Sequence, residues 1–233
     1  MRWFICAVVI AVAGGAHAAP RAVVELFTSP FCSSCPPADE LFVELARSPD
    51  LITLVMPVDS WDRPGRKDAL AKPAFTDRQA AYADVRNEDF LYTPQAVING
   101  AAYAEGSDRS EIGDAIAQTA SALYVPVKAA AVGNDIVVSV GAAKGSTSTG
   151  ATITVLPFFT KRDLAFHGEN ITYANLVRDI VPLGRWTGKP VRQTIPLNDY
   201  AQYDGIVVLL QAGTPQKPGA ILGATRIPIR VKR

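Results

Sequence analysis

The chain has 233 residues, of which 48% are hydrophobic and 19% are charged, and its formal net charge at pH 7 is +1. This apolar content is ample for a folded core, so an intrinsically disordered chain is excluded. The near-neutral charge, with no run of basic residues, argues against a protein that binds nucleic acid through its phosphates.

The first 18 residues have the pattern of a cleaved secretory signal. Arg2 precedes the eleven apolar residues from Trp3 to Ala13, whereas a membrane-spanning helix needs roughly 20. Ala16-His17-Ala18 then fits a cleavage site. We therefore expect an exported mature chain, periplasmic or secreted, without a membrane span. An uncleaved membrane anchor is the alternative.

Removal of residues 1–18 leaves two cysteines, Cys32 and Cys35, and one histidine, His167. Cysteines tend to form disulfides in an exported, oxidising compartment. A structural zinc site normally takes four Cys or His ligands, which these residues do not supply. We therefore expect no metal site and no cofactor.

Residues 20–122 alternate between strand-like and helix-like patterns. We expect strands at 22–28, 51–58 and 95–98, and helices that begin at Pro36, near residue 74 and near residue 109. Asn99-Gly100 predicts a tight hairpin turn, and Asp108 with Glu111 predicts a capped helix start. This order predicts a mainly parallel sheet with helices on its faces and an antiparallel edge.

From about residue 125 the chain consists of short β-type runs separated by Gly, Asn, Asp, Ser and Pro. The runs are VKAAAV, DIVVSV, ATITVLPF, VRQTIPL, GIVVLLQA and ILGATRIPI. Helical periodicity is confined to residues 172–179, and residues 141–150 have the composition of a flexible hairpin loop. This pattern predicts a β-sandwich.

The sequence Cys32-Ser33-Ser34-Cys35 lies between a predicted strand and a predicted helix. Unpaired N–H groups and the helix dipole favour a thiolate at such a position. Cys32 is then the attacking thiol and Cys35, one helical turn further, is the resolving thiol. A structural disulfide, a relic motif without a partner, and a metal site are the alternatives.

Thr93-Pro94 stands at the start of the third predicted strand, where proline removes a backbone donor. Together with the CxxC motif it resembles the thioredoxin-like superfamily, in which a cis-proline faces the two cysteines. That resemblance implies that Thr93 and Pro94 dock the substrate chain, and that the proline ring keeps metals away from the thiols.

A closer resemblance covers residues 23–229. It is carried by VVELFTSPFCSSCPPADELF, VDSWDRPGRKD, PAFTDRQAAYA, YTPQAVING, NITYANLVRDIVPLGRW and GAILGATR. These segments resemble the exported thioredoxin-like family known as domain-of-unknown-function family 1223, which implies a fold and a redox motif but no substrate. Pro30-Phe31, Pro57 and Arg66 depart from that family's pattern, at the rim of the expected site.

Three further residues are candidates for the site. The resemblance to thioredoxin-like proteins implies that Glu25, the only charge in AVVELFT, passes protons to the inner cysteine; an exposed strand-edge glutamate is the alternative. Trp61 and Asp62 follow the second predicted strand, where loops border the active crevice of open sheets. Trp61 is then a lid over the disulfide, unless this segment is an ordinary surface loop.

We therefore predict an α/β thioredoxin-like domain at 20–122, followed by an all-β sandwich-like domain at 125–233. The predicted function is thiol–disulfide exchange with protein substrates, through attack by Cys32 and resolution by Cys35. A separate redox partner would reset the cysteines. The alternative is a non-catalytic thioredoxin-like binding module with a structural or relic disulfide.

Overall fold

A computed structural model describes residues 19–143 and 150–229, so the predicted signal and residues 144–149 of the predicted loop lie outside the described residues. The described part of the chain is mostly β, with 46% of its residues in strands and 20% in helices. The elements in chain order are β1 (Ala22–Thr28), α1 (Pro36–Leu45), β2 (Leu51–Pro57), η1 (Asp59–Trp61), α2 (Pro73–Arg86), β3 (Gln95–Ile98), β4 (Ala102–Glu105), α3 (Arg109–Gln118), β5 (Val127–Val132), β6 (Asp135–Val140), β7 (Ala151–Phe166), β8 (Glu169–Val177), β9 (Val181–Trp186), β10 (Val191–Pro196), η2 (Leu197–Tyr200), β11 (Gly205–Thr214) and β12 (Lys217–Pro228).

The first half is built around β1, which pairs in parallel with β2 and antiparallel with β3. Residues of α1 and α3 pack on one face of these strands and residues of α2 pack on the other. Both β1 and β2 are buried along their whole length, which explains their nearly continuous apolar sequence. The strands and helices predicted for this half are confirmed to within a few residues.

Two local signals in this half act as the sequence predicts. Asn99 and Gly100 have φ angles of 51° and 62°, the left-handed values that a type I′ turn between β3 and β4 requires. The Asp108 carboxylate accepts hydrogen bonds from the Ser110 and Glu111 amides and so caps α3. Glu111 reaches back to the amide of Glu105.

The large sheet continues from the first half into the second. Its strand order is β12-β11-β7-β8-β2-β1-β3-β4, with β9 also paired to β7, which makes nine strands. The long strand β7 pairs with β11 and β9 over its first half and with β8 over its second half. β8 then joins β2 through the Val55–Leu176 bridge, and Asn175 Nδ2 donates to Thr53 Oγ1 over 2.9 Å.

The predicted fold class, an α/β thioredoxin-like domain followed by an all-β sandwich-like domain, is therefore wrong. Because β8 covers the edge that β2 would otherwise expose, the strands of both halves form one mixed sheet. The core under α2 also contains residues of β11 and β12. Residues 172–179, which carry a helical pattern, lie mostly in the strand β8. The predicted boundary near 122–125 falls between α3 and β5, and the division into domains there stays a prediction.

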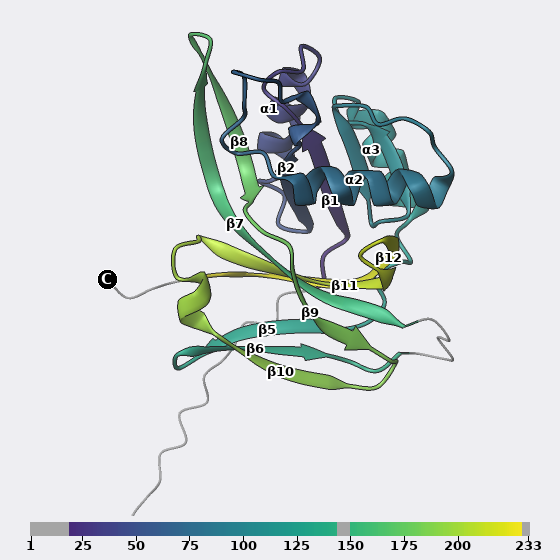
Figure 1. Ribbon diagram of the computed structural model, residues 1–233. Helices are drawn as coiled ribbons and strands as arrows, with labels where there is room; N and C mark the ends of the chain where they lie inside the picture. Colours follow the sequence, from purple (N-terminus) through teal and green to yellow (C-terminus); the bar gives the residue numbers. More distant parts are fainter. Residues whose placement is uncertain (1–18, 144–149, 230–233) are drawn as a thin grey trace, which may run out of the picture.

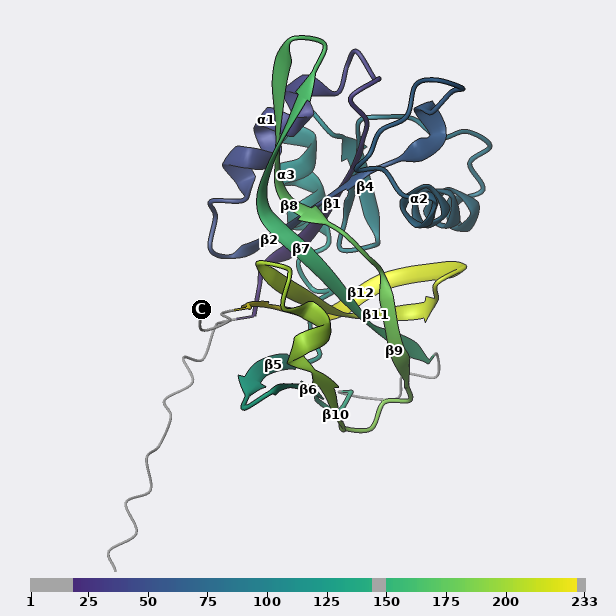
Figure 2. The same ribbon diagram turned by 60° about the vertical axis from the view of Figure 1, so that its left-hand side comes forward.

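A second, three-stranded sheet has the order β10-β6-β5 and packs against one side of the large sheet (Figures 1 and 2). The core between the two sheets contains Ile136 and Val138 from β6, facing Ile153, Trp186 and Ile206. The Trp186 indole donates to the Gly141 carbonyl over 3.2 Å, so even this buried ring is fully hydrogen-bonded.

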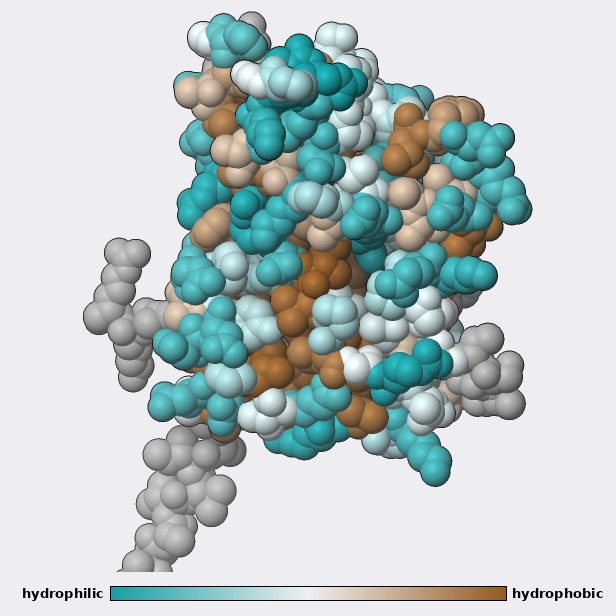
Figure 3. Space-filling model, in the orientation of Figure 1, coloured by the Kyte–Doolittle hydropathy of each residue, from teal (hydrophilic) through white to brown (hydrophobic). Residues whose placement is uncertain are grey.

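The outer half of the β7–β8 hairpin, residues 159–174, extends away from the second sheet and runs alongside α1 in both views (Figures 1 and 2). We call this segment the arm. Figure 3 shows hydrophilic residues at the end of the molecule where the arm turns, and a band of apolar residues lower on the same face. No helix of the described residues is long and apolar enough to span a membrane.

Candidate functional site

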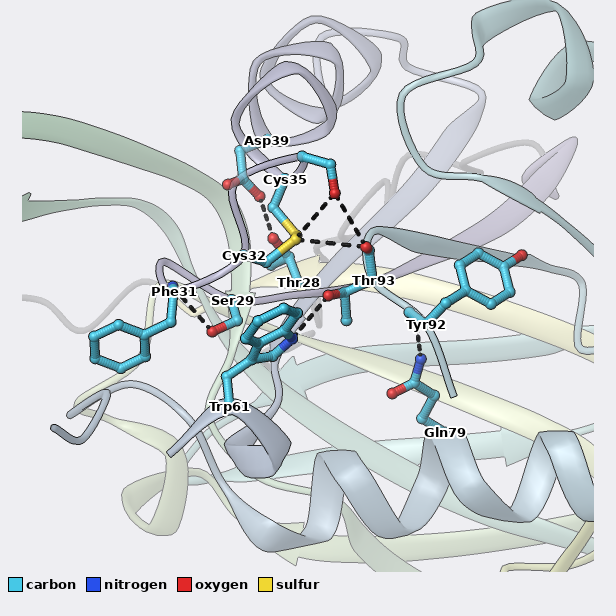
Figure 4. Close-up of a disulfide and its surroundings, with 11 residues drawn as sticks. Thr28, Ser29, Phe31, Cys32, Cys35, Asp39, Trp61, Gln79, Tyr92 and Thr93 are labelled. Carbon is cyan, nitrogen blue, oxygen red and sulfur yellow. Dashed lines mark hydrogen bonds between the residues drawn. A yellow bond between two sulfur atoms is a disulfide. The ribbon is translucent and has the colours of Figure 1, made fainter. Parts of the chain in front are cut away.

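Cys32 and Cys35 form a disulfide at the start of α1 (Figure 4). Cys35 is the N-cap residue, and Pro36 and Pro37 occupy the first helical positions, where proline is well tolerated. Cys35 is fully buried, and Cys32 is 2% exposed and borders a groove. Within the described residues, no group of three or more His, Cys, Asp or Glu is arranged to hold a metal ion.

The helix start differs from the expectation that unpaired N–H groups face the sulfurs. Pro36 and Pro37 have no N–H, and the amides of Ala38 and Asp39 both donate to the Cys35 carbonyl oxygen. The polar groups nearest to the Cys32 sulfur are instead the Ser34 hydroxyl, 3.4 Å away, and the Thr93 carbonyl oxygen, 3.5 Å away.

Thr93 and Pro94, the predicted docking pair, lie beside the disulfide, and the peptide bond between them is cis. The Ser34 hydroxyl donates to the Thr93 carbonyl oxygen over 3.4 Å, so Ser34 links this segment to the CxxC turn (Figure 4). Thr93 is half-buried, so this segment is partly accessible from outside.

Two residues that the sequence analysis did not select fix this segment. Gln79 on α2 donates to the Tyr92 carbonyl over 2.8 Å and to Gln95 Oε1 over 3.1 Å. Gly106 donates its amide to the Pro94 carbonyl, and a Cβ at this position would lie only 2.9 Å from Pro94 Cβ. Only glycine therefore permits this close approach.

Trp61 and Asp62 have different positions relative to the site. The Trp61 indole donates to Thr93 Oγ1 over 2.9 Å, so this ring contacts the docking segment. Trp61 and Thr93 also line a small cavity of about 250 Å³. The Asp62 carboxylate accepts the amide of Asp68 and thus holds its own loop together.

Asp39 is a buried acid beside the disulfide that the sequence analysis missed. It lies four residues after Cys35 on α1 and is 3% exposed. Thr28 Oγ1 donates to Asp39 Oδ1 over 2.8 Å, whereas Asp39 Oδ2 has no partner within the described residues. Burial is the main cause that raises the pKa of this carboxyl to about 7. The i+4 spacing from Cys35, within an apolar helical stripe, is the sequence signal for it.

Two more buried polar groups extend this site, because Tyr173 is in electrostatic range of Asp39 and Asp68 is in electrostatic range of Tyr173. Burial raises the pKa of the Tyr173 phenol, and the charges of Asp39 and Asp68 raise it further. Burial also raises the pKa of Asp68, which is 7% exposed. The Tyr173 hydroxyl and Asp68 Oδ2 have no hydrogen-bond partner within the described residues. Asp39 therefore belongs to a buried cluster of proton-binding groups.

Glu25, the residue expected to relay protons, lies against α2. Its carboxylate receives two hydrogen bonds from Arg78, at 2.8 and 3.0 Å, and one from the Tyr82 hydroxyl. Thr28, three residues later on β1, turns instead toward Asp39 on α1. Glu25 is fully buried, so the alternative of an exposed strand-edge glutamate does not apply.

Two of the residues that depart from the family pattern meet at the rim of the site. The Arg66 guanidinium lies 4.6 Å from the centroid of the Phe31 ring. Phe31 also packs edge-on against Phe166 at the tip of the arm, with 5.1 Å between the ring centroids. The arm therefore contacts the turn that carries Cys32.

The groove at Cys32 has a volume of about 1340 Å³ and lies between α1, the arm, Asp204 just before β11 and the end of β12. Cys32 and Ser33 border it at the disulfide, and Asp39, Thr160 and Arg226 also line it. The disulfide therefore opens onto a cavity long enough to hold more than a single side chain.

The comparisons with known proteins agree with a conserved architecture of this kind. The chain matches the family described as "Protein of unknown function (DUF1223)" over residues 23–211, and it belongs to that family. It is similar to a structural-genomics crystal structure of a protein from Agrobacterium tumefaciens, with 32% identity and a TM-score of 0.83. That similarity covers 94% of this chain and 98% of the other. No curated protein matches the chain.

Proposed function

We propose that the protein is an exported thiol–disulfide oxidoreductase that acts on protein thiols, with the site chemistry of thioredoxin-like proteins on a different overall sheet. The observation that carries the proposal is the position of the Cys32–Cys35 disulfide. It lies between the Thr93 carbonyl oxygen, 3.5 Å from the Cys32 sulfur, and the buried acid Asp39 on the next turn of α1.

The exchange begins at Cys32 because this cysteine borders the groove, whereas Cys35 is fully buried behind it. A substrate thiolate attacks Cys32 Sγ, a mixed disulfide forms, and the Cys32–Cys35 bond breaks. Cys35 leaves as a thiolate and takes up a proton. A second substrate thiolate then attacks the substrate sulfur of the mixed disulfide and releases Cys32. Two substrate thiols become one disulfide, and the reverse sequence reduces a substrate disulfide.

In this proposal Asp39 exchanges a proton with Cys35. It accepts the proton that Cys35 loses and supplies the proton that Cys35 gains. A carboxyl with a pKa of about 7 changes its protonation state at neutral pH, as a group that exchanges protons with a thiol must do. Thr28 holds one of its oxygens, and the unpartnered Oδ2 is the oxygen left to exchange the proton.

Thr93 and Pro94 dock the substrate backbone in this proposal. The Thr93 carbonyl oxygen accepts a hydrogen bond from Ser34 at 3.4 Å, a long contact that a substrate amide can replace. The Trp61 indole fixes the Thr93 side chain, so the carbonyl stays aimed at Cys32.

The proposal includes export of the chain, which the signal-like pattern of residues 1–18 supports. It also includes a second redox protein that resets the cysteines after each exchange. Mass measurement of the purified native protein tests the export step, with a mature N-terminus at Ala19 as the expected result.

Trapping of mixed disulfides tests the exchange. Cys35→Ser, which removes the resolving thiol, is expected to accumulate a mixed disulfide with an unfolded test protein whose cysteines carry glutathione as mixed disulfides. The Cys32 thiolate attacks the test-protein sulfur and glutathione leaves as its thiolate. Cys32→Ser is the matched control and is expected to trap none, because Cys35 is buried. If neither variant formed a mixed disulfide, the exchange function would be contradicted. The alternative, a binding module with a structural or relic disulfide, would then hold.

A further inference from the structure

The groove at Cys32 is larger than the exchange chemistry itself requires. Its volume of about 1340 Å³ exceeds the roughly 300–1,000 Å³ of typical small-molecule pockets. Val43 lines it from α1 and Arg47 from the turn after α1, Thr160 and Asn170 line it from the arm, and Arg226 lines it from β12. A ligand that fills this space extends well away from the sulfur.

The arm forms one wall of the groove, and at Thr160 and Lys161 this wall includes part of a strand edge that no described strand covers. β7 pairs with β11 only as far as Phe158, opposite Gly205. Beyond this point residues 159–166 pair with β8 on one side, while on the other side the Asp204 carboxylate accepts the Thr160 amide over 2.8 Å. Residues 160–163 are exposed. An open strand edge of this kind can pair with the backbone of an extended polypeptide.

Acidic and basic side chains both line the groove, but two arginines without an acidic partner among the described residues lie away from the disulfide, at what we call its basic end. Arg47 and Arg226 line it, and neither forms a salt bridge within residues 19–143 and 150–229. Glu44 is already paired with Arg109, and Asp204 already accepts the Thr160 amide. The basic end therefore complements an acidic side chain.

The length of α1 sets the distance between the basic end and the disulfide. The ten residues of α1 span about 15 Å at 1.5 Å per residue, and Arg47 follows two residues after the helix ends at Leu45. An extended polypeptide covers this distance in about five residues at roughly 3.3 Å each. An acidic residue about five positions from a substrate cysteine would thus reach the arginines.

We propose that the groove binds an extended polypeptide segment next to the substrate cysteine, with an acidic side chain about five residues away placed against Arg47 and Arg226. The segment lies along α1 and reaches the open edge of β7 at Thr160 and Lys161. This inference rests on the proposed function, because the segment is positioned by a cysteine that reacts at Cys32. It adds a recognition site for polypeptide sequence to the redox site.

The test compares three thiol probes on the oxidised protein: N-acetylcysteine amide, and two peptides of about ten residues with one cysteine and either Glu or Lys about five positions away. Each thiolate attacks Cys32 Sγ and displaces the Cys35 thiolate, and acid quenching with mass spectrometry gives the rate of mixed-disulfide formation. The Glu peptide is expected to react about tenfold faster than the capped cysteine, and clearly faster than the Lys peptide.

Two pairs of variants locate the effect in the groove. Arg47→Glu is expected to reverse the preference between the Glu and Lys peptides, whereas Arg192→Glu, an equally exposed site on the second sheet, leaves it unchanged. Asn170→Trp fills the groove and is expected to remove most of the peptide advantage. Asn134→Trp, an exposed site outside the groove, is its control. The two control variants should react normally with the capped cysteine, and for the groove variants each peptide rate is divided by the capped-cysteine rate of the same variant.

The outcomes separate this inference from the proposed function. Normal reaction with the capped cysteine but no advantage for either peptide would overturn the groove inference and leave the exchange function intact. No mixed disulfide with any probe would overturn both. A groove variant that changed the sedimentation of the protein instead of the peptide preference would assign the groove to a second copy of the chain, which contradicts the proposal.

Discussion

Asp39 lies one helical turn after Cys35, and its amide donates to the Cys35 carbonyl oxygen over 3.1 Å. The carboxyl is buried against Thr28 and keeps one oxygen without a partner in the described part of the chain. A carboxyl with a pKa of about 7 therefore lies one helical turn from the inner cysteine. This relationship makes the protonation of the site measurable in two independent ways.

The first measurement is stability against pH. Burial raises the pKa of Asp39 from 3.8 to about 7, so the native state holds its proton while the unfolded state releases it. The contribution of this carboxyl to the free energy of unfolding is therefore complete below about pH 4. It falls as the pH rises above 4 and is lost by about pH 7. Asp39→Asn removes that loss, and the variant should gain up to about 4 kcal/mol over the wild type at pH 8. Urea unfolding of the oxidised protein checks this. Asp50→Asn, at an exposed acid, should show no such gain.

The second measurement is the reactivity of the inner thiol. In a Cys32→Ser background, the alkylation rate of Cys35 should show a pH step near 7 that disappears in Asp39→Asn. Glu25→Gln should keep the step, because the Glu25 carboxylate is held by Arg78 and Tyr82. If Glu25→Gln abolished the pH step and Asp39→Asn kept it, Glu25 would be the proton relay and Asp39 would not.

The ion pair between Glu25 and Arg78 should be essential for folding stability. Glu25→Ala leaves the Arg78 guanidinium, which is 8% exposed, without its carboxylate. Breaking a buried pair in this way typically costs about 3–5 kcal/mol. Chemical denaturation should show a loss of this size. A loss below about 1 kcal/mol would mean that Gln211 and Tyr82 satisfy the guanidinium alone.

Trp61 and Thr93 should act as a coupled pair. Trp61→Phe and Thr93→Val each remove one end of the 2.9 Å hydrogen bond between the indole and Oγ1. In a double-mutant cycle on stability, we expect a coupling free energy of about 0.5–1.5 kcal/mol. Each single variant should also slow mixed-disulfide formation at Cys32. If the two substitutions had purely additive effects on the free energy of unfolding and on the rate of mixed-disulfide formation, Trp61 would have no role at the site.

Phe31 and Arg66 should also be coupled, although neither is typical of the family pattern. The guanidinium lies 4.6 Å from the ring centroid, and such a cation–π contact at an exposed site contributes about 0.5–1 kcal/mol. A cycle with Phe31→Leu and Arg66→Gln should recover a coupling of this size. The Leu side chain keeps an apolar contact with Phe166, so the arm should remain in place.

Much of the local structure could be predicted because its signals are local. Pro36 and Pro37 mark the start of α1, Asn99-Gly100 marks the turn between β3 and β4, and Asp108 marks the start of α3. Each of these residues acts on its own backbone or on that of its near neighbours. Patterns of this kind do not depend on how the rest of the chain folds.

The joined sheet could not be predicted in the same way. The bridge between Val55 and Leu176 connects segments that are far apart in the sequence, and nothing in either segment specifies its partner. The positive φ of Asn175 places its amide against Thr53, a feature that a helical or strand pattern does not reveal. The predicted two-part fold class was wrong for this reason.

The candidate site was predictable in part. The CxxC motif and Thr93-Pro94 were recognised from short patterns, and the structure brings them together. Asp39 has a sequence signal in its spacing from Cys35, but Tyr173 and the arm reach the site only through the long-range strand pairing. The groove therefore follows from the tertiary structure alone.

The equilibrium reduction potential of the Cys32–Cys35 pair tests the central claim most directly. The protein would be equilibrated in a glutathione series, its free thiols alkylated, and the two redox states quantified by mass. The exchange function predicts a potential between roughly −120 and −270 mV, the range of thioredoxin-like exchange proteins. A potential below about −300 mV would mark a structural disulfide that resists reduction, and it would contradict the proposed function.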